Sequence, residues 1–397
     1  MNTQPSASST SESVSDGDLS IVFRYRLTAP WEEQQVVNVE FSADNKFLIV
    51  LWPWREPTAL TISRGWHEVL TYDLETRACL RLGPLGLSLL DGYCVAARGA
   101  APGPASKKPN YKLSAIVPGK SRPVLPLAIC HNPPINRALD STPSIDIVDL
   151  HKTKRTRCST TAQIQGPLAW SPDGSILAGL HFGDPTKISL FNAQMDGIPL
   201  RVCLPGQLAE ITQLAFMPDG QSILSLASDG VGRMVSISPA SPGKLLKSFC
   251  APSLGRYPAS DMQISPNGKC VASIWGRLIV RWHPDSDELE SCDLQSIRPD
   301  ADLFPLAISP ECHLLACRYD TGVEVCDLLT GQRRGKVRYK PGGTGFATAA
   351  AFGGPGGGGG TMLAVGMFGG EVTIYSVLGD EDVPPVEVEL HEQLADL

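Results

Sequence analysis

The sequence contains no long apolar run: nowhere in its 397 residues do apolar residues approach the ~18 in succession that a membrane-spanning helix needs. Charge is also scarce, because Asp, Glu, Lys and Arg make up only 19% of the chain. The net charge of −7 lies at the ends, since residues 380–397 carry seven acids and the first eighteen residues carry three, without Lys or Arg in either segment. The remaining body is slightly basic, at about +3, which argues against a dedicated nucleic-acid binder.

Sequence motifs for metal or covalent chemistry are missing as well. The eleven cysteines are odd in number and include no CxxC, the seven histidines show no HxH or HxxxH spacing, and no GxSxG occurs. We therefore predict free, reduced thiols, no metal and no cofactor. A site assembled in space from separate loops stays open, so the pattern leaves enzyme activity undetermined.

The first eighteen residues lack the basic and apolar regions of a signal peptide, and we expect a Ser/Thr-rich disordered tail there. We expect a second, acidic tail over 380–397 and a cytoplasmic or nuclear location, with no membrane association. Two basic runs, 151–157 and 333–340, are interpreted as outer-strand or turn residues, with a nuclear-import signal as the alternative.

Glycine (38 residues) and proline (33 residues) are abundant, as is typical of many short strands joined by tight turns. One pattern recurs: an apolar run, a Ser-Pro-Asp-Gly-like turn and a second apolar run. The copies are VEFSADNKFLIVL (39–51), LAWSPDGSILAGL (168–180), LAFMPDGQSILSL (214–226), MQISPNGKCVASI (262–274), LAISPECHLLACR (306–318) and, more weakly, AAFGGPGGGGGTMLAVG (350–366). A further β-rich run follows each copy, and SIDIVDL (144–150) is a seventh such run.

The turns at 171, 217, 265 and 309 are spaced by 46, 48 and 44 residues, a period typical of propeller blades. A single four-stranded sheet cannot bury its apolar faces alone, whereas a ring of sheets lets each one pack on two neighbours. The pattern predicts an all-β fold, a seven-bladed β-propeller. Because the last repeat has no outer strand of its own, we expect the N-terminal strand at 19–28 to close the last blade.

These repeats resemble WD40-type repeats over nearly all of residues 20–379. The apolar run–turn–apolar run is similar to strands a and b of that family, and the next run ends in pairs such as Tyr72-Asp73 where the family has Trp-Asp. No true Trp-Asp occurs, so the chain is identified as a divergent WD40-like propeller. The resemblance implies scaffold or adaptor work within a larger complex.

The predicted domain boundaries are a tail over 1–18, a propeller over 19–379 and a tail over 380–397. Within the propeller, two insertions are expected between strands b and c, at 53–67 in the first blade and at about 98–143 in the second. Loops b–c and d–a of a blade open on one face of a propeller, so both insertions are expected on that face. The residues predicted to form a partner-binding face there are Trp52, Trp54, Arg55, Trp66, Arg233, Trp275, Arg277, Arg318 and Tyr319, and Phe368 lies in another b–c turn.

A basic and aromatic face suits a protein partner, including an acidic or phosphorylated segment. The function predicted from the sequence is thus a non-catalytic protein–protein interaction scaffold. The alternative is an enzyme of hydrolase, isomerase or cyclase type, with a small-molecule pocket at the propeller axis or under the second insertion. A deep, apolar pocket with convergent ionisable groups near His67, His131 or His181 would favour the enzyme, whereas a broad, shallow aromatic and basic face would favour the scaffold. The partner and the oligomeric state stay open.

Overall fold

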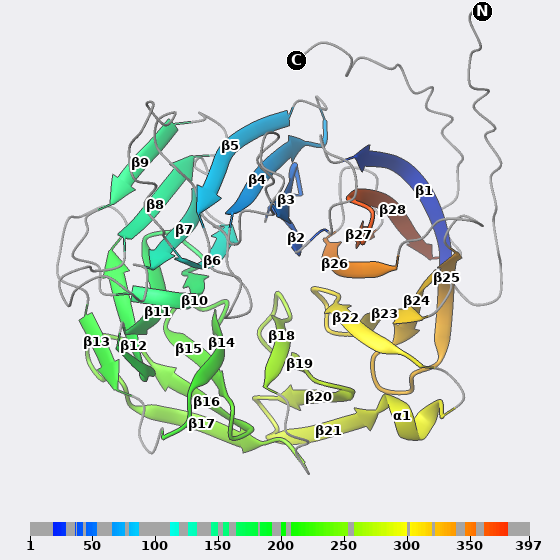
Figure 1. Ribbon diagram of the computed structural model, residues 1–397. Coiled ribbons are helices and arrows are strands. Elements are labelled where there is room, and N and C mark those ends of the chain that lie inside the picture. The colour runs from blue at the N-terminus through cyan, green and yellow to red at the C-terminus, as the bar shows by residue number, and fades with distance from the viewer. Residues whose placement is uncertain are drawn as a thin grey trace, which may run out of the picture.

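Small antiparallel sheets surround a common centre in the computed structural model, which gives an all-β, propeller-like architecture (Figure 1). Among the described residues the one helix is α1 (Leu294–Ile297), a single turn. The structure describes residues 19–28, 36, 38–42, 45–53, 66–75, 79–86, 112–118, 126–132, 144–149, 154–158, 164–181, 183–192, 200–203, 208–252, 258–299, 302–319, 322–338, 346–354 and 361–379.

Hydrogen bonding divides the strands into seven sheets of four strands each. Three sheets come from the first half of the chain: β2 (Asn38–Phe41), β3 (Phe47–Pro53), β4 (Trp66–Asp73) and β5 (Cys79–Gly86); β6 (Lys112–Pro118), β7 (Pro126–Asn132), β8 (Ser144–Asp149) and β9 (Lys154–Cys158); β10 (Ile164–Trp170), β11 (Ile176–His181), β12 (Asp184–Asn192) and β13 (Leu200–Cys203). Three more follow: β14 (Ile211–Phe216), β15 (Ser222–Ala227), β16 (Val231–Ser236) and β17 (Leu245–Cys250); β18 (Ala259–Ile264), β19 (Val271–Trp275), β20 (Leu278–His283) and β21 (Glu288–Asp293); β22 (Phe304–Ile308), β23 (Leu314–Tyr319), β24 (Gly322–Asp327) and β25 (Arg333–Arg338). The last sheet has the order β1 (Leu19–Thr28), β28 (Glu371–Gly379), β27 (Thr361–Met367), β26 (Ala347–Gly353).

The recurring turn is closed by its serine. In the third sheet Ser171 N donates to Ile176 O at 2.8 Å, and Ile176 N donates to Ser171 Oγ at 2.9 Å. Gly174 N donates back to Ser171 O, and Gly174 has φ +69°, a conformation that costs glycine little. The same serine contacts recur in the fifth sheet, where Cys270 N donates to Ser265 Oγ at 2.9 Å. Each copy of the motif therefore reverses the chain between the first and second strands of a sheet.

The N-terminal strand completes the last sheet, which confirms that part of the prediction. β1 pairs antiparallel with β28, with Leu19 opposite Gly379 and Thr28 opposite Glu371. Side chains reinforce the pairing, because Arg24 Nε donates to Ser376 Oγ at 2.6 Å and Arg26 Nη1 lies 3.3 Å from Glu371 Oε1. β1 thereby covers an outer edge that β28 would otherwise leave unpaired.

The core lies between the sheets, in apolar clusters that receive side chains from two neighbours. Between the fourth and fifth sheets, for example, Leu224 and Trp282 belong to one cluster, and Trp282 is only 1% exposed. Its ring lies 4.9 Å from that of Phe249, between ring centroids. This arrangement is the physical reason why no single sheet could be stable alone.

The predicted seven-bladed ring, in which every sheet packs on both neighbours, needs a correction. The innermost strands of successive sheets pack at six junctions rather than seven, because β2 and β6 make no comparable contact among the described strands. The sequence of β2 supplies the reason: Val39 and Phe41 pack toward the last sheet, so strand alternation leaves Asn38 and Glu40 on the other face. These polar side chains offer no apolar surface to a neighbouring sheet.

The prediction of an insertion over about 98–143 is wrong, because this stretch contains β6 and β7, the first and second strands of the second sheet. Its turn lacks the Ser-Pro-Asp-Gly pattern, so the motif did not reveal the hairpin. The apolar sequence at 87–97, LSLLDGYCVAA, predicts a strand that would partner the run at 144–150, and it lies outside the described residues. In the first sheet β3 ends at Pro53 and β4 begins at Trp66, and the residues between them are also outside the described part, as are the tails 1–18 and 380–397.

Candidate functional surface

Two arginines and three phenylalanines from three consecutive sheets stack in a row on one face of the propeller. We call this set the Phe–Arg ladder; in spatial order it consists of Arg277, Phe304, Arg318, Phe346 and Phe368. All three phenylalanines are exposed, by 37%, 42% and 46% in that order. Exposed apolar groups gathered in one place mark interaction surfaces more often than isolated ones do.

The topology explains why these residues meet. Arg277 lies in the turn between β19 and β20, and Arg318 lies near the end of β23, so both belong to b–c connections. Phe304 begins β22 and Phe346 immediately precedes β26, so both follow d–a connections. Phe368 immediately follows β27. Connections of these two kinds open on the same face, which brings residues from positions 277 to 368 together.

The rings and guanidinium groups lie at stacking distance. The Cζ atoms of Arg277 and Arg318 are 4.7 Å and 4.6 Å from the centroid of the Phe304 ring. Arg318 Cζ is also 5.0 Å from the Phe346 centroid. The rings of Phe346 and Phe368 stack with centroids 5.1 Å apart at an interplanar angle of 18°. Cation–π contacts at exposed sites stabilise by ~0.5–1 kcal/mol each, so the ladder holds its own shape.

Backbone and polar contacts fix the two ends of the ladder. Phe368 N donates to Phe346 O at 2.9 Å, which sets the two stacked rings beside each other. Arg277 donates to the side chains of Gln295 and Asp302 in the connection that precedes β22. Its charge is therefore balanced within the molecule.

Arg318 differs from Arg277. Its Nη1 donates to the carbonyl oxygen of Ala347 at 3.3 Å, and it has no ion-pair partner among the residues that the structure describes. A guanidinium carries five N–H donors in its own plane, and a carboxylate could accept from those that Ala347 does not use. The centre of the ladder is thus an uncompensated positive charge flanked by apolar surface.

Three residues of the sequence-predicted face lie in or beside this ladder: Arg277, Arg318 and Tyr319. Tyr319 follows Arg318 directly, and its hydroxyl is buried without a hydrogen-bond partner among the described residues. Trp275 lies two positions before Arg277 but is only 3% exposed, and its Nε1 donates to Ser273 Oγ at 2.9 Å. It supports the turn from inside and offers no surface to a partner.

The other predicted residues lie elsewhere or outside the described part. Arg233 on β16 is mostly buried and lies 3.8 Å from Asp229 Oδ2. Trp52 is the second-last residue of β3, opposite Glu68, and Trp66 begins β4, so their backbones flank the first b–c connection. Trp54 and Arg55 lie outside the described residues. The structure therefore brings together two of the four predicted arginines, Arg277 and Arg318, around aromatic residues of later sheets.

Phe304 and Phe346 were missed by sequence reasoning. Both follow d–a connections, which open on the same face as the b–c loops, whereas the predicted face drew its aromatic residues from the b–c loops alone. The signal was present, since DLFPLAI (302–308) and TGFATAA (344–350) each place a phenylalanine just before or at the first strand of a sheet. What no pattern could supply is the distance between the two rings and the guanidinium of Arg318.

A second polar feature lies at the innermost strands, where β2 carries Glu40 and β18 carries Asp261. The Asp261 carboxylate accepts hydrogen bonds from Met262 N at 2.8 Å and from Ile308 N at 3.0 Å. Burial raises the pKa of Asp261, and these hydrogen bonds oppose the rise. Burial also raises the pKa of Glu40 to about 8, with a further contribution from repulsion by Asp261. Since β2 and β18 belong to non-neighbouring sheets, this repulsion acts across the centre of the ring (Figure 1).

Metal and membrane features are absent from the described ranges. No group of three or more His, Cys, Asp or Glu side chains in them could hold a metal ion. Nor does any helix there have the length and apolar character needed to cross a membrane. Comparison of the chain with known protein families gave no match, and no curated protein matched it.

Proposed function

We propose that this protein is a non-catalytic interaction platform that binds a protein partner through the Phe–Arg ladder. The observation that carries the proposal is the sandwich of Arg318 between Phe304 and Phe346, which presents a cation and two exposed rings on one face. Aromatic residues and arginine are enriched at protein interfaces, because they combine large contact area with directed hydrogen bonding. The WD40-like resemblance of the repeats supports the same role.

The chemistry of the ladder indicates the kind of partner. Arg318 offers its guanidinium edge to a carboxylate or phosphate, and the rings on either side offer apolar surface. A matching segment therefore carries an acidic side chain next to an aromatic or aliphatic one. Binding such a segment would cover the exposed rings and supply the negative charge that the described residues do not give Arg318.

Location is part of the proposal: we place the protein in the cytoplasm or the nucleus. Six cysteines of the later sheets are free thiols, as suits a reducing compartment; they are Cys250, Cys270, Cys292, Cys312, Cys317 and Cys326. The two basic runs overlap β9 and β25, the outermost strands of their sheets. Residues paired in a strand are poorly suited to a receptor that reads extended signals, which favours the outer-strand interpretation.

The enzyme alternative rests on three histidines. His181 Nδ1 lies 3.4 Å from Ser189 Oγ, and the side chains of His67 and His131 are outside the described part. This contact by itself does not form a reaction centre. The binding platform is therefore the function that we propose, and the Phe–Arg ladder is the structural observation that supports it.

The test is selection of peptides from a random displayed library on the full-length protein, followed by titration calorimetry of a selected peptide. We expect acidic peptides with apolar neighbours. They should bind Arg318→Gln at least tenfold more weakly than the unaltered protein, the loss expected for one charge-assisted hydrogen bond. Phe346→Ser should weaken binding to a similar extent, because it removes a ring that the peptide would cover. The matched control is Leu246→Ser, an exposed apolar residue on the outer strand β17, and its affinity should be unchanged.

Two results would contradict the proposal. One is equal affinity of Phe346→Ser, Leu246→Ser and the unaltered protein for every selected peptide. The other is selection of peptides without acidic residues that bind Arg318→Gln normally. Melting temperatures of all variants show whether each remains folded, so loss of binding can be separated from loss of structure.

A further inference from the structure

Two cysteines meet at the junction between the fifth and sixth sheets. Cys270 precedes β19, at the end of the turn that begins at Ser265, and Cys312 is the fourth residue of the corresponding turn in the next sheet. In the other intact copies this fourth position is glycine, with φ near +70°; these residues are Gly174, Gly220 and Gly268. Cys312 has φ +60°, a conformation that residues with a side chain rarely adopt.

The side chain of Cys312 points into the neighbouring turn. It is 1% exposed, and its Sγ lies 3.5 Å from Gln263 O and 3.8 Å from Cys270 O. A side chain thus stands where the repeat usually has none, and its sulfur contacts the backbone carbonyl of the other cysteine. Cys270 itself is partly exposed, whereas Cys312 is buried.

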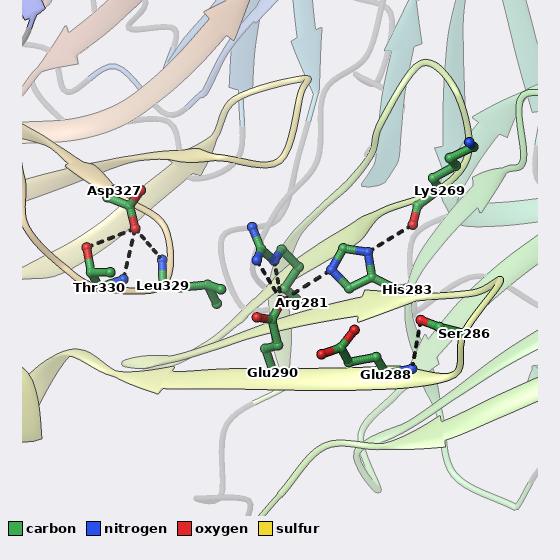
Figure 2. A network of polar contacts seen from close by, with 9 residues as sticks. All are labelled: Lys269, Arg281, His283, Ser286, Glu288, Glu290, Asp327, Leu329 and Thr330. Carbon is green, nitrogen blue, oxygen red and sulfur yellow. Dashed lines mark hydrogen bonds and ion pairs between the residues drawn. The ribbon is translucent and has the colours of Figure 1, made fainter.

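Charged groups from β20 and β21 surround this pair. Arg281 Nη2 lies 2.7 Å from Glu290 Oε2, and His283 Nε2 lies 3.2 Å from the same oxygen (Figure 2). The other ring nitrogen of His283 is 3.2 Å from the carbonyl oxygen of Lys269, the residue before Cys270. The imidazole and the guanidinium are therefore anchored beside the cysteine by one shared carboxylate.

This environment favours the thiolate of Cys270 over that of Cys312. The hydrogen bond from Cys312, then the nearby His283 and Arg281, lower the pKa of Cys270 to about 7, against opposing effects of burial and Glu290. The pKa of Cys312 is raised, by its hydrogen bond to Cys270 and by burial. The thiolate is the reactive form of cysteine, so the two residues have different chemical roles.

We propose that Cys270 and Cys312 form an oxidisable pair, in which Cys270 reacts with a peroxide and Cys312 then closes a disulfide between two sheets. The Cys270 thiolate attacks one peroxide oxygen: a sulfur–oxygen bond forms, the oxygen–oxygen bond breaks, and the leaving alkoxide or hydroxide takes a proton. Cys312 sulfur then attacks Cys270 sulfur, and the sulfenic hydroxide leaves with the Cys312 proton as water. Two thiols lose two electrons, which reduce the peroxide to an alcohol or water and a second water.

Cys250 and Cys292 lack this combination of features. Cys250 is exposed, but its described contact is with the carbonyl oxygen of Ala251 at 3.8 Å. Cys292 is buried, and burial is the main cause that raises its pKa to about 11. Cys250 is therefore the matched control for exposure, and Cys292 is the control for an unreactive thiol.

The experiment treats the reduced full-length protein with one to ten equivalents of hydrogen peroxide, blocks free thiols, and maps the products by tandem mass spectrometry. We expect a Cys270–Cys312 crosslink before any change at Cys250 or Cys292. In Cys312→Ser, a sulfenic acid at Cys270 should persist and be trapped by dimedone. In Cys270→Ser, no crosslink to Cys312 should form. Alkylation of Cys270 against pH, measured on unoxidised protein, should be half-maximal near pH 7.

The proposal is overturned if Cys250 oxidises first, or if Cys270 accumulates sulfenic acid in the unaltered protein without a crosslink to Cys312. An alkylation midpoint for Cys270 above pH 8.5, the range of an ordinary thiol, would also count against it. None of these outcomes bears on the Phe–Arg ladder, which lies on the opposite face, so the two proposals fail separately.

Discussion

Replacing Glu40 by glutamine tests the electrostatics at the centre of the ring. Glutamine keeps the size of the side chain and removes its titration. In the folded protein the pKa of Glu40 is raised from 4.5 to about 8, mainly by burial and secondarily by Asp261. In the unfolded chain the carboxyl group titrates at its ordinary value. Below pH 4.5 the group is protonated in both states and carries no cost.

As pH rises above 4.5, the unfolded chain loses this proton while the folded protein retains it, so the free energy of unfolding falls. The fall ends near pH 8, where the folded protein also ionises. Within this window the free energy of unfolding falls by at most ~1.4 kcal/mol per pH unit. The total loss between pH 4.5 and about 8 is therefore at most ~5 kcal/mol. Because Glu40 retains partial exposure and its titration is coupled to Asp261, we expect about 2 kcal/mol.

The assay is urea unfolding followed by tryptophan fluorescence at pH 5, 6.5 and 8, for the unaltered protein and Glu40→Gln. The variant should match the unaltered protein at pH 5 and exceed its stability by ~2 kcal/mol at pH 8. Glu288→Gln, at an exposed position on β21, is the control and should show no such trend. A stability difference that is constant across the three pH values, or that shrinks as pH rises, would refute the reasoning.

Three further predictions concern the fold. Trp282→Ala should lower the free energy of unfolding by ~3–5 kcal/mol, because it empties a fully buried site beside Phe249; a loss below 1 kcal/mol in urea would contradict this. Deleting residues 1–28 should lower the melting temperature far more than deleting 1–17, because only the first removes β1, and equal melting temperatures would count against the pairing with β28. Ser309→Ala should cost ~1–2 kcal/mol, since it removes the buried acceptor that closes a turn, and chemical unfolding measures it.

The repeat in the sequence was sufficient to predict the strands, their turns and the partner of the N-terminal segment. Local physics explains this success: a serine five residues before a strand closes the turn whatever surrounds it, and an outer edge must be paired. The second sheet was misread for the same reason, because its hairpin at β6 and β7 uses a different turn. The polar face of β2 was visible in the sequence, but its consequence for packing depends on which sheet that face meets.

The candidate surface was only half predictable. Its arginines were predicted because b–c turns can be located in a repeat. Phe304 and Phe346 belong to the surface because the packing of the sheets places their rings beside the guanidinium of Arg318. The same holds for Cys270 and Cys312, whose thiols lie 42 positions apart in the chain.

By itself, then, the sequence determined the all-β character of this chain, the length of its repeat unit and the closing role of its first strand. These properties depend on side-chain alternation and turn chemistry within a few residues. Only the tertiary structure decided which junction lacks strand packing, which aromatic rings flank Arg318, and which cysteine faces another. Those outcomes depend on distances between sheets, and residues far apart in the sequence acquire a common neighbour only once the ring has formed.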